Sequence, residues 1–117
     1  EAFSADTVEI VERLQAQGTT DATATADLLE GLAPTGLVVT LDAVREARAA
    51  SGLREALEGE YRRVLWFVHE HPDLVEGIRA QLVDKDRNPK WQPASLAELG
   101  TDAGADARAY VPVTPLF

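Results

Sequence analysis

The sequence predicts an all-α chain of five to six helices, because its apolar residues repeat at helical spacing. From Leu53 to Val68 they recur every three or four residues, which places them on one face of a helix. Leu74, Ile78 and Leu82 then repeat at intervals of four. Neither an internal repeat nor a sustained heptad interrupts these patterns, so the helices are expected to pack as one domain of modest core.

Two helices are expected at the start of the chain. The first runs from about residue 5 to residue 17, and Gly18 is placed to end it in the left-handed conformation. A second, weaker helix follows from Asp21, whose carboxylate can cap its N-terminus. The apolar face of the first helix is Val8, Val11 and Leu14. That of the second is Leu28, Leu29 and Leu32.

Residues 37–41 are compatible with two structures. Their β-branched side chains would suit a buried strand, and periodicity alone does not decide the matter. We predict a helix from Pro34 to about residue 50, because proline is favoured at the first helical position. The spacing of Leu37, Leu41 and Val44 also continues through alanine-rich sequence without a break.

The longest predicted helix begins near residue 53, with Ser51 as a possible cap, and ends before Pro72. Gly59 interrupts it at a cost of roughly 1 kcal/mol relative to alanine, which suggests that a second backbone approaches there. Trp66 and Phe67 widen the apolar arc beyond one face. This helix is therefore expected to need cover on two sides.

A central helix should run from Pro72 to residue 83 or 84 and end in a charged loop over residues 84–92, where Pro89 forbids further helix. Ser95 and Glu98 have capping-box spacing for a short helix ending near Gly100. We assign residues 1–99 to one helical region. Residues 100–117 lose the helical period and are expected to form an extended tail.

Composition excludes several classes of function. The net charge of −9 repels a phosphate backbone, so we expect no nucleic-acid partner. Without cysteine the chain has no disulfide or thiol chemistry, which fits a cytoplasmic location. No apolar run approaches the roughly 20 residues of a membrane helix, so no membrane partner is expected. Nine arginines and abundant alanine suggest a bacterial genome rich in GC, and a chain that begins with Glu1 and lacks Met suggests processing or excision from a larger protein.

The polar residues offer no obvious catalytic or metal site. His69 and His71 are two residues apart, which points them to different sides of a helix, and no third ligand lies nearby in the sequence. Asp84 and Asp86 lack the spaced oxygen ligands and central glycine of a calcium loop. No phosphate-binding glycine loop and no pairing of nucleophile with base is present. We therefore predict no metal and no catalytic residue in this chain.

Four stretches in the same order resemble the 3-hydroxyisobutyryl-CoA hydrolases, a branch of the enoyl-CoA hydratase/isomerase (crotonase) superfamily. They are residues 3–9 (FSADTVE), 33–37 (APTGL), 58–62 (EGEYR) and 76–91 (EGIRAQLVDKDRNPKW), the last being the most specific. Gly36 departs from the usual serine, and Gly59 with Glu60 stands where a large apolar residue often precedes glutamate. The resemblance covers residues 3–99.

The resemblance implies a fold in which a spiral of β-β-α turns precedes C-terminal helices, and this chain carries only the helices. The oxyanion hole and the acid/base carboxylates of such enzymes belong to the spiral core, so no catalytic residue transfers to this sequence. The implied role is to cover the acyl-CoA site and to mediate subunit contacts. The implied parent is a 3-hydroxyisobutyryl-CoA hydrolase acting in valine breakdown, or alternatively an enoyl-CoA hydratase/isomerase, with coenzyme A as part of the substrate and no further cofactor.

The resemblance also implies three substrate-binding residues. Lys85 aligns with a lysine that the superfamily places at the adenine-ribose end of coenzyme A, and Lys90 and Trp91 are candidates for the same rim. Two simpler interpretations stay open. Lys85 could pair only with Asp84 or Asp86, and Trp91 could simply fix the loop between its prolines.

Two further expectations concern partners. Without a spiral core, apolar residues such as Trp66, Phe67 and Leu82 would lack cover, so the isolated chain is expected to self-associate. It is also expected to be catalytically inactive, because the oxyanion hole and the catalytic carboxylates implied by the resemblance lie outside it. The alternative from another functional class is a free-standing acidic helical module that binds a partner protein through the surface of Trp66 and Phe67.

Overall fold

The computed structural model describes residues 2–99 and 102–117, and within these ranges the chain forms helices and no strand. The all-α prediction is therefore confirmed, and residues 37–41 belong to a helix. A π-helical turn, Arg79–Val83, extends α5, and a 3₁₀ turn occupies Leu96–Glu98. The six α-helices of the described residues are α1 (Ala2–Gln17), α2 (Thr20–Glu30), α3 (Pro34–Ala49), α4 (Leu53–Glu70), α5 (Asp73–Ile78) and α6 (Ala103–Ala109).

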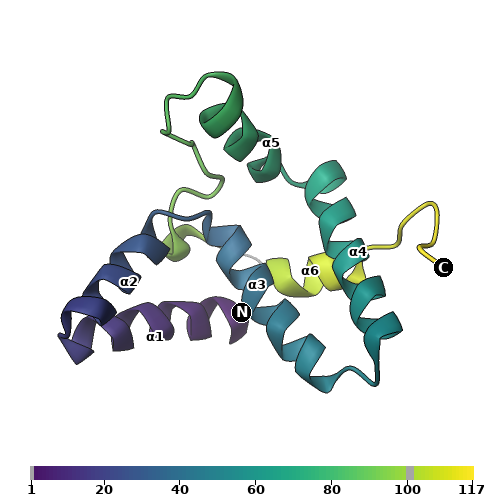
Figure 1. The fold of residues 1–117 in the computed structure, drawn as a ribbon, viewed down its shortest axis with the longest axis horizontal. Helices are drawn as coiled ribbons and strands as arrows, with labels where there is room; N and C mark the ends of the chain where they lie inside the picture. Colours follow the sequence, from purple (N-terminus) through teal and green to yellow (C-terminus); the bar gives the residue numbers. More distant parts are fainter. Residues whose placement is uncertain (1, 100–101) are drawn as a thin grey trace.

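The helices form an open arrangement around α3 (Figure 1). Helices α1 and α2 pack together as a hairpin, and α3 packs against α1, α4 and α6. At the far end of α4 the chain turns into α5, which projects away from the other helices before the following loop returns toward α2 and α3. The radius of gyration is 15.3 Å, compared with about 13 Å for a compact domain of this length. Much apolar surface is consequently left open.

Two helix starts differ from the sequence prediction. Helix α1 begins at Ala2, about three residues earlier than expected. The cap of α2 is Thr19 rather than Asp21, because Thr19 has extended backbone angles and its Oγ1 accepts the Ala22 N–H at 3.2 Å. Asp21 lies instead in the first turn, where its charge complements the helix dipole. Gly18 has φ +70°, which confirms its predicted left-handed role.

Val11 of α1 is buried as predicted, but α2, α3 and α4 do not bury the faces that their large apolar residues predicted. Helix α2 buries Ala22 and Ala26, while Leu28 remains 65% exposed, because small side chains let α1 and α2 approach closely. Helix α3 was expected to present Leu37, Leu41 and Val44 and instead buries a set at spacing three and four. That set is Thr35, Val38, Val39 and Asp42.

Helix α4 also turns a different face inward. Its buried residues are Gly59, Arg63 and Trp66, whereas much of the predicted apolar stripe, including Val64 at 54% exposure, is open. The close approach at Gly59 comes from side chains and not from a second backbone. A Cβ at Gly59 would lie 3.1 Å from Arg63 Nη1 and 3.3 Å from Glu46 Oε2.

A buried ion-pair cluster joins α3, α4 and α6. The side chain of Asp42 is 1% exposed, and its Oδ2 accepts a hydrogen bond from Arg63 Nη2 at 3.2 Å. Arg63 also pairs with Glu46, and Arg108 of α6 approaches Asp42 Oδ1 at 3.5 Å. Arg62 Nε donates to the Arg108 carbonyl oxygen at 3.1 Å. Removing one partner of such a buried pair costs about 3–5 kcal/mol, so the cluster fixes how the three helices meet.

The prediction of an extended tail is wrong for residues 103–109, because they form α6. Asp102 caps this helix by accepting the Ala105 N–H at 3.1 Å, and alanine has the highest helix propensity. Ala103 and Ala107 pack on Trp66, which is only 9% exposed. Trp66 therefore has cover, contrary to the expectation that the isolated chain leaves it open. Residues 110–117 carry no helix, and Tyr61 Oη donates to the Thr114 carbonyl oxygen at 2.9 Å.

The predicted capping box at Ser95 and Glu98 does not form. Ser95 makes no side-chain cap, and Glu98 Oε2 instead accepts the Ala94 N–H at 3.3 Å. The predicted end near Gly100 lies outside the described residues. Among the described helices, none is both long enough and apolar enough to cross a membrane.

Gly104→Ala should destabilise the chain relative to Gly36→Ala. Both glycines lie in the first turn of a helix, so both substitutions share a gain in helix propensity of up to about 1 kcal/mol. A Cβ on Gly104 would lie 2.9 Å from Asp42 Cβ, whereas one on Gly36 would lie 3.5 Å from Ala33 Cβ. Overpacking costs about 1–3 kcal/mol, and we expect the two variants to differ by that amount in urea unfolding. Equal urea midpoints for the two variants would contradict the close packing of Gly104 against Asp42.

Candidate functional site

The loop of residues 84–92 folds back beside α5 and is fastened at its far end to other helices. Trp91 Nε1 donates to the Gly31 carbonyl oxygen at 3.2 Å. The Gln92 N–H donates to Asp73 Oδ1 at 2.9 Å, and Thr35 Oγ1 donates to the Gln92 carbonyl oxygen at 3.4 Å. These contacts bring the start of α5, the end of α2 and the start of α3 to one place.

Arg79 holds the near end of the same loop. Its Nε and Nη2 donate to the two oxygens of Glu76 at 2.9 and 2.7 Å, a bidentate pair. Its Nη1 donates to Asp84 Oδ2 and to Asp86 Oδ2, both at 2.8 Å. The planar guanidinium presents its donors as a fork, which allows one side chain to bind three carboxylates.

Backbone hydrogen bonds end the helix inside this network. The Asp84 N–H donates to the Arg79 carbonyl oxygen at 2.8 Å, which closes the π-helical turn, and the Arg87 N–H donates to the Ala80 carbonyl oxygen at 3.0 Å. Lys85 and Arg87 have φ values of 55° and 53°, in the left-handed region that residues with a Cβ seldom occupy. The predicted central helix is therefore confirmed to Val83, with a wider last turn than expected.

The network lowers the pKa of two carboxyl groups. Hydrogen bonds from Arg79, followed by the Lys90 N–H, lower the pKa of Glu76 from 4.5 to about 2. Asp86 has a lowered pKa chiefly because Arg79 donates to it, with the Asn88 N–H as a second donor. Both groups are held in the charged form that Arg79 binds.

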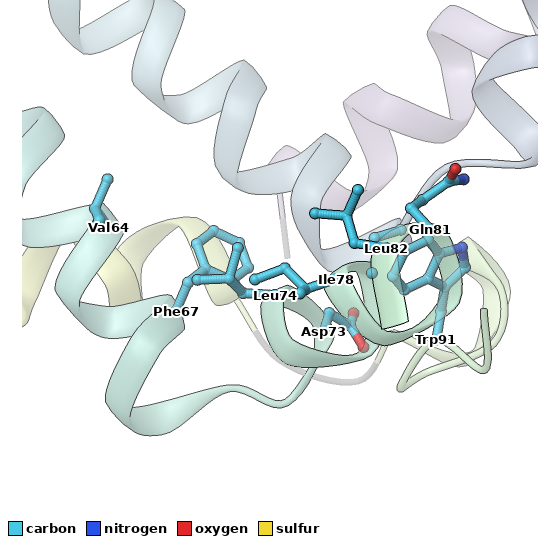
Figure 2. Close-up of a pocket in the computed structure, with 10 residues that line it drawn as sticks. Val64, Phe67, Asp73, Leu74, Ile78, Gln81, Leu82 and Trp91 are labelled. Atoms are coloured by element: carbon cyan, nitrogen blue, oxygen red, sulfur yellow. The ribbon is translucent and has the colours of Figure 1, made fainter. Parts of the chain in front are cut away.

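An open apolar groove lies between α4 and α5 and has a volume of about 590 Å³. Figure 2 shows Val64 at one end, then Phe67 and Leu74 together, Ile78 in the middle, and Leu82 beside Trp91 at the other end. Leu82 is 67% exposed. The remaining lining residues are Ala33, Asp73, Gly77 and Gln81.

Trp91 forms one wall of this groove by lying against Gly77. Its Cη2 and Cζ3 atoms would be 3.4 and 3.6 Å from a Cβ at Gly77, so the absence of a side chain there gives the indole its place. The indole is half-buried and its only N–H is bonded to Gly31. Trp91 thus helps to fix the loop, through its hydrogen bond to Gly31 and its packing on Gly77, and its role in substrate binding stays a prediction.

The three predicted substrate-binding residues share one loop but do not converge on one hollow. Trp91 lines the groove, whereas Lys90 lines a second hollow of about 690 Å³ with Arg79 and His71. Lys85 is exposed and lines neither. Within the described ranges it makes no ion pair, whereas Asp84 and Asp86 both bind Arg79. The simpler interpretation, in which Lys85 pairs with those aspartates, is therefore wrong for this structure.

The residues that organise the site were not predicted from the sequence. Glu76 and Arg79 are three residues apart on a helix, a spacing that permits a pair and could have identified them. The contact between Asp73 and Gln92 carries no sequence signal, because it joins residues on either side of a loop. His71 stacks on Trp66 with ring centroids 5.3 Å apart. Over residues 2–99 and 102–117 no group of three or more His, Asp or Glu side chains is placed to hold a metal ion.

Comparison with known proteins finds relatives that agree with one another in family. The family model described as enoyl-CoA hydratase/isomerase matches residues 1–107. Mitochondrial 3-hydroxyisobutyryl-CoA hydrolase from Homo sapiens is 42% identical over 98 residues, which are 83% of this chain and 25% of the human protein. The 3-hydroxyisobutyryl-CoA hydrolase-like protein 5 of Arabidopsis thaliana is 37% identical over 106 residues, covering 85% of this chain and 27% of that protein.

A solved structure shares the fold. The crystal structure of a carnitinyl-CoA dehydratase from Mycobacterium thermoresistibile superposes with a TM-score of 0.78 and 42% identity, covering 92% of this chain and 30% of that one. The chain thus spans about a quarter of the length of the curated relatives that it matches. The match of the family model also extends past residue 99, into α6.

Glu76→Gln should weaken the dependence of stability on acid pH. Because the pKa of Glu76 is lowered on folding, its contribution is complete above about pH 4.5 and is lost as the pH falls toward about 2. The free energy of unfolding in urea, measured between about pH 5 and about pH 3, should fall less steeply in Glu76→Gln than in the unmodified chain. Glu12→Gln, on the exposed face of α1, is the control and should keep the original slope. If the free energy of unfolding depended on pH identically in all three proteins, the ion-pair network of Glu76 and Arg79 would be contradicted.

Proposed function

The chain belongs to the enoyl-CoA hydratase/isomerase family, and we propose that it is the helical region of an acyl-CoA enzyme, where it covers the acyl-CoA site and makes subunit contacts. The enzyme we propose is a 3-hydroxyisobutyryl-CoA hydrolase, which cleaves a coenzyme A thioester in valine breakdown. The observation that carries this choice is the 42% identity to the human hydrolase over 98 residues.

A covering role agrees with the apolar surface that the fold leaves open. Helix α5 packs mainly on α4, and the groove between them exposes Val64, Ile78 and Leu82. Exposed apolar patches of this kind usually mark a surface that packs against another partner. The proposed partner is the part of the longer enzyme that holds the thioester, and the groove is the surface that we expect to face it.

The loop supplies the proposed contacts to coenzyme A. Lys85 extends into solvent without an ion pair among the described residues, so its ammonium is available to a phosphate group. Trp91 lines the groove and offers the face of its indole for stacking on adenine. Its N–H is bonded to Gly31, which holds the ring in place. Lys90 adds a second ammonium at the second hollow.

A hydratase or dehydratase parent is the second candidate. The observation that favours it is the solved structure, whose title names a carnitinyl-CoA dehydratase and which is also 42% identical. In either parent the reacting groups would belong to the remaining part of the enzyme, so we propose that this chain alone is inactive. The protein-interaction module is less favoured, because Trp66 is buried under α6 and does not offer the binding surface assumed for it.

Self-association and location stay as proposals. The exposed side chains of the groove, and Leu82 above all, give the isolated chain a reason to pair with a second copy. Location in the cytoplasm of a bacterium was expected from composition alone, and the human relative is named as mitochondrial.

Lys85→Ala in the longer enzyme should raise KM for the coenzyme A ester with little change in kcat. The proposed contact is remote from the reacting carbonyl, so it should bind ground state and transition state equally. An exposed charge contact contributes up to about 1 kcal/mol, which corresponds to at most about a fivefold rise in KM. Arg13→Ala, which removes an exposed cation from α1, is the matched control. An unchanged KM at low ionic strength, where screening is weakest, would remove Lys85 from the site.

A further inference from the structure

The segment from Glu76 to Lys90 differs in charge from the rest of the chain. It contains the cations Arg79, Lys85, Arg87 and Lys90, against three carboxylates, in a protein whose net charge is −9. All three carboxylates bind the same cation, Arg79. Within the described residues, the other three cations make no ion pair.

The sequence alone would predict different ion pairs in this segment. Asp84 and Asp86 are the immediate neighbours of Lys85 and lie within easy reach of its side chain. Their Oδ2 atoms instead accept hydrogen bonds from Arg79 Nη1, and Asp86 Oδ1 accepts the Asn88 N–H at 2.9 Å. The left-handed backbone at Lys85 and Arg87 accompanies this arrangement, and both cations are exposed.

We propose that Arg79 is a positioning residue that sequesters Asp84 and Asp86, so that Lys85 and Arg87 are presented unpaired to a phosphate-bearing anion. Without Arg79, the two aspartates would turn to the nearest cations and compete with the anion for them. Arg87 is thereby added to the proposed contact. The inference rests on the proposed function only for the presence of a phosphate group in the ligand.

Inorganic pyrophosphate is the probe that tests this proposal on the 117-residue chain. Binding is followed at low ionic strength by the NMR chemical shifts of the Lys85 and Arg87 amides. The decisive variant is Glu76→Gln with Arg79→Gln, since it has the same net charge as the unmodified chain but releases both aspartates. We expect its affinity for pyrophosphate to fall roughly three- to fivefold, the range of an exposed charge contact.

Rescue separates sequestration from simple ordering of the loop. Adding Asp84→Asn and Asp86→Asn to the double variant removes the competing carboxylates, and affinity should return to at least the original value. The indole N–H signal of Trp91, which is bonded to Gly31, reports in each variant whether the loop is still fastened. A double variant that binds as well as the unmodified chain would overturn the role of Arg79 and leave the Lys85 contact intact.

Two other outcomes would also be decisive. A loss of affinity that the asparagines do not restore would show that Arg79 orders the loop and nothing more, which overturns sequestration. If pyrophosphate shifts no amide of the loop in the unmodified chain, the phosphate contact itself fails, and the assignment of Lys85 fails with it.

Discussion

The guanidinium of Arg79 is the interaction on which the candidate site depends. It joins the last regular turn of α5 to a loop that has no helical or strand pairing of its own, through Glu76, Asp84 and Asp86. The loop in turn places Trp91 against Gly77 and brings Gln92 to Asp73. Because one side chain supplies all three ion pairs, the geometry of the loop and the availability of Lys85 have a common cause.

A second arginine plays the corresponding part in the fold, under different electrostatic conditions. Arg63 is buried with Asp42 where α3, α4 and α6 meet, so loss of either partner would leave an uncompensated charge in the interior. Arg79 is partly exposed, and its pairs are individually weak and screened by salt. Loss of Arg63 should therefore lower the stability of the fold, whereas loss of Arg79 should change the shape and charge of the loop.

The sequence predicted the helices better than it predicted their contacts. Period and turn residues placed α3, α4 and the π-extended α5 correctly, since Pro34, Pro72 and Pro89 act locally. The predicted buried faces of α2, α3 and α4 were wrong because apolar size was the criterion, and this fold uses Ala22, Ala26 and Gly104 to bring helices together. Helix α6 was missed because a seven-residue run of alanine, glycine and charged residues has no apolar stripe. Lys85 and Trp91 were predicted as substrate-binding residues from a family resemblance alone. The ion pairs of Arg79 with Asp84 and Asp86 could not be predicted, because they depend on the left-handed backbone of the loop.

We propose that this helical region covers a coenzyme A thioester through the loop of residues 84–92 and the adjoining groove. Hydrogen–deuterium exchange of the longer enzyme, with and without a coenzyme A thioester, would test this role. We expect the ligand to slow exchange of the amides in residues 84–92 and in α5, and to leave those of α1 unchanged. Equal exchange in the loop with and without the ligand, at a concentration that saturates turnover, would contradict it.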